Sequence, residues 1–167
     1  MEKINIVRAT LNENQIDLLV SEIQKTVNIT GYTKKEWAHF NTIFIAYYEQ
    51  NFAGVCVNIS INNQWEELAV LFVLPQFQGK GIGTLLFETG LHAILSEGKK
   101  AYTTSRNELV ITMMKQQKFQ FVPLKKLPLS IQFFNLRFVL SSYRIQEFFR
   151  KKMYSSKLPE FMFGVKE

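Results

Sequence analysis

Hydrophobic and polar residues follow two different periods along the chain, and the change from one to the other predicts a mixed α/β fold. Four segments in the first half are short apolar or alternating runs bounded by polar residues, as expected for strands: residues 4–9, 43–48, 52–61 and 65–73. Only short polar stretches separate the last three of these segments. We therefore predict a three-strand meander that follows an N-terminal strand.

Capping residues mark where helices begin. The motifs Asn-x-x-Gln from Asn12 and Thr-x-x-Glu from Thr33 have the spacing of capping boxes, which predicts a helix after each. A further helix follows the meander, carries its apolar residues on one stripe and ends near Gly98. Beyond it we predict a strand at 101–105, a helix at 108–117 and a strand at 119–122. This alternation favours a mixed sheet covered by helices.

The C-terminal segment, residues 124–167, departs from this regularity because it is long, aromatic and basic. Large apolar side chains are interleaved with arginine and lysine through residues 129–153, where we expect one or two helices. Their aromatic face should pack on the core or line a binding site, since so many large apolar side chains would otherwise be exposed. The alternative is that the segment presents aromatics and cations to nucleic acid or to a membrane. Residues 161–163 offer a final strand.

Three glycines at alternate positions, Gly79, Gly81 and Gly83, stand between the strand that ends at Val73 and the amphipathic helix. Without Cβ atoms, their backbone N–H groups can converge on one point, where the first helical turn and the helix dipole already favour an anion. Lys80 adds a mobile positive charge. We therefore predict a pyrophosphate-binding site. The spacing lacks the ending of a P-loop and the final gap of a dinucleotide fingerprint, so neither nucleotide motif fits.

The run from Gln78 to Gly83 closely resembles the Gln/Arg-x-x-Gly-x-Gly/Ala signature of the GNAT superfamily, the acyl-CoA-dependent N-acyltransferases. Residues 73–77, Val-Leu-Pro-Gln-Phe, resemble the run that leads into that signature. Asn107, seven residues before Met114 and twelve before Phe119, has the spacing of the family's second motif. The resemblance covers about residues 3–123. It implies a GNAT fold, in which helices flank a mixed, mostly antiparallel central sheet of about six to seven strands.

The same resemblance implies that acetyl-CoA is the cosubstrate and that no metal takes part. The residues to which it assigns binding of acetyl-CoA are Leu71, Phe72, Val73, Gln78, Gly79, Lys80, Gly81, Ile82, Gly83, Thr84, Asn107 and Met114. A backbone N–H near Val73 would polarise the thioester carbonyl, and the Asn107 side chain would bind the pantetheine amides. The acceptor would be a primary amine whose identity the fold does not specify.

An amine acceptor has to lose a proton before or during attack. A lysine-type amine with a pKa near 10.4 costs about 4.6 kcal/mol to deprotonate at pH 7, so a general base is expected. Glu67 is the first candidate, because its position on the strand before the glycine loop resembles that of the base in some family members. Glu66 is the second, and strand alternation sends the two side chains to opposite faces. The alternative is that both are ordinary carboxylates and that water relays the proton.

Met114 stands where the family usually has a tyrosine that acts as general acid, and a thioether cannot donate a proton. Because a thiol pKa is near 8.5, the CoA sulfur leaves as a fairly stable anion, and the acid is helpful rather than compulsory. Hydroxyl groups of residues 102–105, or water, are the substitutes. The departure also motivates a second function, a catalytically weak CoA-binding sensor or regulatory module.

Length and composition favour one domain over residues 1–167, with a family-like core at about 3–123 and an extension at 124–167. At 167 residues and 47% hydrophobic, the chain can fill one core. Its longest apolar runs fall short of the roughly 20 residues needed to cross a bilayer. The N-terminus begins a strand-like stretch instead of a signal peptide. We therefore expect a cytoplasmic protein without a membrane span.

Charge is unevenly distributed between the two halves. Residues 1–98 carry six Lys/Arg and ten Asp/Glu, net −4, whereas residues 99–167 carry fourteen and four, net +10. CoA is polyanionic, so part of this charge can steer the cosubstrate. An anionic partner of the C-terminal half, such as a nucleic acid, is the third functional alternative, and a solvated basic face is the plainest interpretation. A homodimer also remains open.

Overall fold

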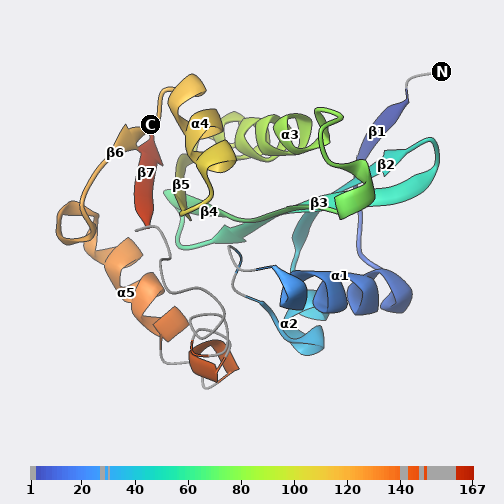
Figure 1. The fold of residues 1–167 in the computed structure, drawn as a ribbon. Coiled ribbons are helices and arrows are strands. Elements are labelled where there is room, and N and C mark those ends of the chain that lie inside the picture. The colour runs from blue at the N-terminus through green and yellow to red at the C-terminus, as the bar shows by residue number, and fades with distance from the viewer. Residues whose placement is uncertain (1–2, 27–28, 30, 140–142, 147–148, 150–160) are drawn as a thin grey trace.

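The computed structural model describes residues 3–26, 29, 31–139, 143–146, 149 and 161–167. Its centre is a seven-stranded sheet with the order β1-β2-β3-β4-β5-β7-β6 (Figure 1). The strands are β1 Ile4–Arg8, β2 Thr42–Tyr48, β3 Asn51–Ser60, β4 Trp65–Val73, β5 Lys100–Ser105, β6 Gln120–Phe121 and β7 Met162–Lys166. The predicted mixed sheet and its meander are confirmed. The final strand forms too, inserted between β5 and β6.

Pairing across the middle of the sheet is short. Strands β1 to β4 pair antiparallel, as do β5 with β7 and β7 with β6. Strands β4 and β5 pair parallel, and only where Trp65–Glu67 meet Lys100–Tyr102. Because β4 continues to Val73 and β5 to Ser105, the two strands run on without pairing to each other. Among the described residues, the second half of β4 therefore has no strand paired on its β5 side.

Helices cover both faces of the sheet, with α3 and α4 on one side and α1 and α2 on the other (Figure 1). Their bounds are α1 Glu13–Lys25, α2 Lys34–His39, α3 Ile82–Ser96 and α4 Glu108–Gln116. Each face has its own buried apolar cluster: Leu86, Phe87 and Ile94 belong to the cluster under α3, and Leu19 and Trp37 to the one under α1 and α2.

Local sequence signals fix the helix ends. The Asn12 side chain accepts from the Gln15 N–H while the Gln15 side chain accepts from the Asn12 N–H, so the predicted capping box forms. Thr33 and Glu36 form the second box at α2. Helix α3 ends where Gly98 takes a φ of +70°, a left-handed conformation that glycine adopts without steric cost.

The C-terminal segment contributes helix α5, Leu129–Val139, which follows a short 3₁₀ turn, η2 Leu124–Lys126. Another 3₁₀ turn, η1 Pro75–Phe77, lies between β4 and α3. Ile131 of α5 is buried in a third cluster with Trp65 and Tyr102, as the core-packing expectation requires. Leu129 and Phe133 are 69% and 66% exposed, so that expectation holds for only one face of the helix. The rest of the predicted long helical segment, apart from residues 143–146, lies largely outside the described residues.

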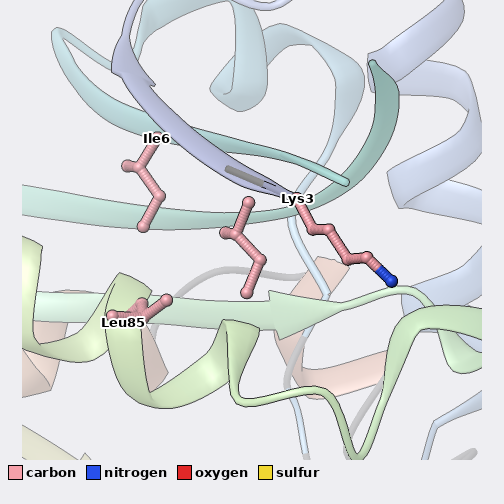
Figure 2. Close-up of a pocket in the computed structure, with 4 residues that line it drawn as sticks. Lys3, Ile6 and Leu85 are labelled. Carbon is pink, nitrogen blue, oxygen red and sulfur yellow. The ribbon is translucent and has the colours of Figure 1, made fainter. Parts of the chain in front are cut away.

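A surface hollow of about 410 Å³ lies between β1 and α3, where Ile6 and Leu85 approach each other beside Lys3 and Ile4 (Figure 2). None of the residues assigned to acetyl-CoA or to proton transfer lines it. Among the described residues, no helix combines the length and apolar character needed to cross a membrane. The same residues contain no cluster of three or more His, Cys, Asp or Glu side chains that could hold a metal ion.

Candidate functional site

The glycine loop between β4 and α3 has the conformation that its sequence demands. Gly79 and Gly81 have φ values of +75° and +80°, which residues with a Cβ adopt only at a cost of about 1–2 kcal/mol. A Cβ built at either position would meet no atom within 4 Å. The space beside both glycines is therefore open, and glycine is required there by the backbone rather than by packing.

The first turn of α3 opens directly from this loop. Gly81 is the N-cap residue and supplies no side-chain hydrogen bond, so the first N–H groups of the helix are left for another acceptor. Ile82 is 1% exposed, which leaves only its backbone to contribute, whereas Thr84 is exposed. Lys80 is held near the loop by the Tyr48 ring, with Nζ 5.0 Å from the ring centroid. The arrangement suits a polyanionic group such as a pyrophosphate.

The end of β4 presents its backbone toward β5. The Leu74 N–H donates to the Ala53 carbonyl of β3 at 2.9 Å. Successive N–H groups of a strand point to opposite edges, so the Val73 N–H points away from β3. The Gln78 side chain donates to the Val73 carbonyl at 3.0 Å and ties the loop to the strand end. Phe72 is buried under α1 and α2, so it can contact a ligand only through its backbone.

Asn107 and Met114 occupy different environments. Asn107 is the N-cap of α4, and its side-chain oxygen accepts from the Leu109 N–H at 3.0 Å, which leaves its amide nitrogen for another partner. Met114 is fully buried, and its terminal methyl would lie 2.5 Å from a Cβ built at Gly164. Met113 lies closer to the glycine loop, with its methyl 3.9 Å from a Cβ built at Gly83. Met114 is thus packed against β7.

This packing predicts the outcome of restoring the family's tyrosine. Met114→Tyr should lower the free energy of unfolding by about 1–3 kcal/mol, because a larger ring and a hydroxyl must enter a filled site beside Gly164. The corresponding fall in melting temperature is roughly 2–12 °C by differential scanning fluorimetry. Met114→Leu conserves volume and should cost less than about 1.5 kcal/mol. Equal stability of the tyrosine variant and the wild type would contradict the packing argument.

The two candidate glutamates are separated by the sheet. Glu66 pairs with Lys99 at 2.8 Å, just beyond the C-terminal end of α3. Glu67 lies on the other face and is 4% exposed, and its Oε2 finds no hydrogen-bond partner among the described residues. Burial raises the pKa of Glu67 to about 7, with the positive charge of Arg144 acting in the opposite direction. A carboxyl group that is half ionised near pH 7 is suited to accept a proton.

Three further residues interact electrostatically with Glu67. Tyr32, from the connection between α1 and α2, is buried, and burial followed by the charge of Glu67 raises its pKa. Tyr102, opposite Glu67 in the parallel pairing, has a pKa raised by the same two causes, and its hydroxyl accepts from the Asn135 amide of α5 at 2.9 Å. The third residue is Arg144. Tyr102 was already a candidate among the hydroxyl groups, whereas Tyr32 and Arg144 belong to no motif, and no pattern in the sequence marks them.

Residues 12–119 match the family model described as Acetyltransferase (GNAT) family. The chain belongs to this family. The matched residues run from the cap of α1 to Phe119 and include the glycine loop, both glutamates and α4. The resemblance inferred from the two motifs is therefore confirmed, and with it the prediction that this chain is an acyl-CoA-dependent acetyltransferase. No curated protein sequence matches this GNAT protein significantly.

Solved GNAT structures share its fold at low sequence identity. An acetyltransferase from Streptococcus agalactiae superposes with a TM-score of 0.67 and 14% identity, covering 99% of both chains. A GNAT family acetyltransferase from Elizabethkingia anophelis, solved with acetyl-CoA bound, gives 0.56 and 12%, covering 100% of this chain and 99% of that one. N-acetylglutamate synthase from Neisseria gonorrhoeae gives 0.64 and 16%, covering 98% of this chain. This chain spans only 34% of that synthase.

Proposed function

We propose that this GNAT protein transfers an acetyl group from acetyl-CoA to a primary amine by direct attack within a ternary complex. The observation that carries the proposal is Glu67: a buried carboxyl group with a pKa of about 7, located where β4 and β5 stop pairing. Acetyl-CoA supplies the acetyl group as a thioester. Its use is supported by the family match and by the acetyl-CoA bound to the Elizabethkingia anophelis structure.

The residues present fit such a cosubstrate. Gly79 and Gly81 leave open space beside a helix N-terminus, and Lys80 adds a positive charge. The Val73 N–H would hydrogen-bond the thioester oxygen, where a single donor of this kind contributes about 3 kcal/mol in other acyl-transfer sites. Leu71, Gln78, Gly83 and Thr84 would line the same region, and the amide nitrogen of Asn107 would donate to the pantetheine arm.

Glu67 would take the proton that the amine loses, directly or through one water, as the amine nitrogen bonds to the acyl carbon and the carbon–sulfur bond breaks. Glu66 is the weaker candidate because its carboxylate is already paired with Lys99. The thiolate would leave without a side-chain acid. Of the substitute hydroxyls, those of Tyr102, Thr103 and Thr104 are buried, and Thr103 donates to the Leu68 carbonyl at 2.9 Å.

The family match and the structural neighbours favour this function over the CoA-binding sensor and over the nucleic-acid-associated protein. The acceptor remains unassigned, since small amines, peptides and aminoacylated RNA all carry a suitable amine. An anionic partner of the basic half, a homodimer and a cytoplasmic location stay predictions from the sequence.

The test is release of free thiol from acetyl-CoA by the purified protein across a panel of small amines, peptides and aminoacylated RNA. We expect release above the uncatalysed rate with at least one class, and mass spectrometry should find that acceptor heavier by one acetyl group. Tight CoA binding without release from any member would favour the sensor instead. Retention on RNA that falls steeply with salt, again without transfer, would favour the nucleic-acid-associated protein.

A further inference from the structure

Arg144 joins the C-terminal segment to α2 across more than a hundred residues of sequence. Its Nη2 donates to Glu36 Oε1 at 2.6 Å, and its guanidinium carbon lies 4.7 Å from the centre of the Tyr32 ring. The Arg144 side chain is only 13% exposed. Two partners in a largely desolvated setting hold the guanidinium more firmly than a surface ion pair would, because the planar group can pair with a carboxylate and stack on a ring together.

The Glu36 carboxylate is itself fixed from two sides. Its Oε2 accepts from the N–H and the hydroxyl of Thr33, at 2.8 and 2.9 Å, as part of the α2 capping box, which leaves Oε1 for Arg144. Tyr32 packs edge-on against Trp37 and Phe40, with ring centroids 6.1 and 5.1 Å away. The groups that hold Arg144 are therefore rigid parts of the fold, and the charge that they hold has a defined position.

That charge acts on Glu67. Arg144 lowers the pKa of Glu67 against the larger effect of burial, and Glu67 and Arg144 also act in opposite directions on Tyr32. Among the described residues, the ionisable groups that interact electrostatically with Glu67 are Tyr32 from the α1–α2 connection, Tyr102 from β5, and Arg144, while Glu36 acts on Tyr32. Arg144 is the positively charged member of this group. Both tyrosines are neutral at physiological pH, because their pKa values are raised.

We propose that Arg144 is a positioning residue of the transfer reaction: anchored on Glu36 and Tyr32, it holds a fixed positive charge against the Tyr32 ring, where it stabilises the carboxylate form of Glu67. The inference rests on the proposed role of Glu67 as the base. It assigns a function to one residue of the C-terminal segment, Arg144. It also gives the capping box of α2 a second purpose, because the box orients the carboxylate that holds Arg144.

The first measurement needs no acceptor. Isotope-edited infrared titration of glutamate carboxyl groups in the purified protein, with Glu67→Gln to assign the band, should place the Glu67 pKa about one unit or more higher in Arg144→Gln than in the wild type. Arg144→Lys keeps the charge and should stay near the wild-type value. Lys99→Gln is the matched control, since it removes an equal charge from Glu66 on the other face and should leave Glu67 unmoved. If Arg144→Gln does not fold, Arg144→Met, with its longer apolar stem, replaces it.

The second measurement is the pH dependence of kcat/KM with whichever acceptor gives signal. Raising the base's pKa by one unit from about 7 lowers the ionised fraction at pH 7 about fivefold, so Arg144→Gln should lose about that factor there and recover at high pH. An unmoved Glu67 titration, or Arg144→Lys titrating like Arg144→Gln, would overturn the proposal. Absence of transfer by the wild type would instead count against the proposed function, which keeps the two failures distinct.

Discussion

Glu67→Gln should lower the transfer rate by about 10² to 10⁴ at pH 7, the range that loss of a general base produces. The amide is nearly the same size as the carboxyl group but cannot accept the amine proton. Much of the loss should be recovered at high pH, where the acceptor amine deprotonates unaided. The measurement is kcat/KM from pH 6 to pH 10, in which the wild type should lose activity as pH falls through about 7, the pKa that burial gives Glu67.

Calorimetric titration with CoA provides the control for Glu67→Gln. Glu67 lies on the opposite face of the sheet from α3, the helix that follows the glycine loop, so its replacement should leave CoA affinity unchanged. Glu66→Gln is the matched substitution one position away. It removes a carboxylate paired with Lys99 and should change the rate much less. A flat rate in Glu67→Gln together with a large loss in Glu66→Gln would transfer the role to Glu66. Small effects in both would favour water as the proton relay.

Glu67→Gln should also be more stable than the wild type at alkaline pH. Burial raises the folded-state pKa of Glu67 from an ordinary 4.5 to about 7, so the neutral carboxyl is favoured in the fold and its contribution is complete below pH 4.5. That contribution is lost as pH rises through about 7, and amounts to roughly 3 kcal/mol at most. Urea unfolding at pH 8.5 should therefore find Glu67→Gln more stable by about 1–3 kcal/mol, with the difference vanishing near pH 4.

Gly81→Val should weaken CoA binding by about 10- to 100-fold, which corresponds to about 1.4–2.7 kcal/mol. Two effects act together. A β-branched residue is strained at a φ of +80°, so the loop would leave the conformation that aims its N–H groups at one point. The new side chain would also fill space that is open beside the loop. Calorimetric titration with CoA measures the loss directly.

Gly98→Val separates strain from ligand contact. Gly98 has a φ of +70° and open space around its Cβ position, but it lies at the far end of α3. Gly98→Val should lower the free energy of unfolding about as much as Gly81→Val does, because the backbone strain is similar, and should leave CoA affinity intact. Lys80→Ala should cost only about 1 kcal/mol of binding, because an exposed lysine contributes a screened charge. Unchanged CoA affinity in a folded Gly81→Val protein would remove the glycine loop from the site.

Short-range patterns determined much of this protein from sequence alone. A capping box needs only residues three positions apart, and the glycine loop needs glycine wherever the backbone adopts a positive φ, so Asn12, Thr33, Gly79 and Gly81 could be interpreted without the fold. Strand and helix periods are equally local, which is why all seven strands were anticipated. The family motifs are also contiguous or nearly so, and they carried the assignment to the GNAT family.

Long-range packing decided the rest. The register of β3 and β4 shifts between Val57 and Asn58, so Ala69 is an extra residue in β4, and this bulge reverses the side-chain alternation that would have put Glu67 on the same face as Leu71 and Val73. No local pattern marks the bulge. That Glu66 is the glutamate held in an ion pair followed only from the placement of Lys99.

Long-range packing also decided the environments of Arg144 and Met114. The contact between Arg144 and Glu36 joins residues 108 positions apart, and nothing in either local sequence indicates the other. Met114 matches a family position by spacing, yet its burial depends on β7 entering the sheet beside β5 and bringing Gly164 against it. Sequence spacing places a residue on a helix. Only the neighbouring elements decide whether its side chain meets a ligand or the core, because burial and pKa depend on atoms contributed from distant parts of the chain.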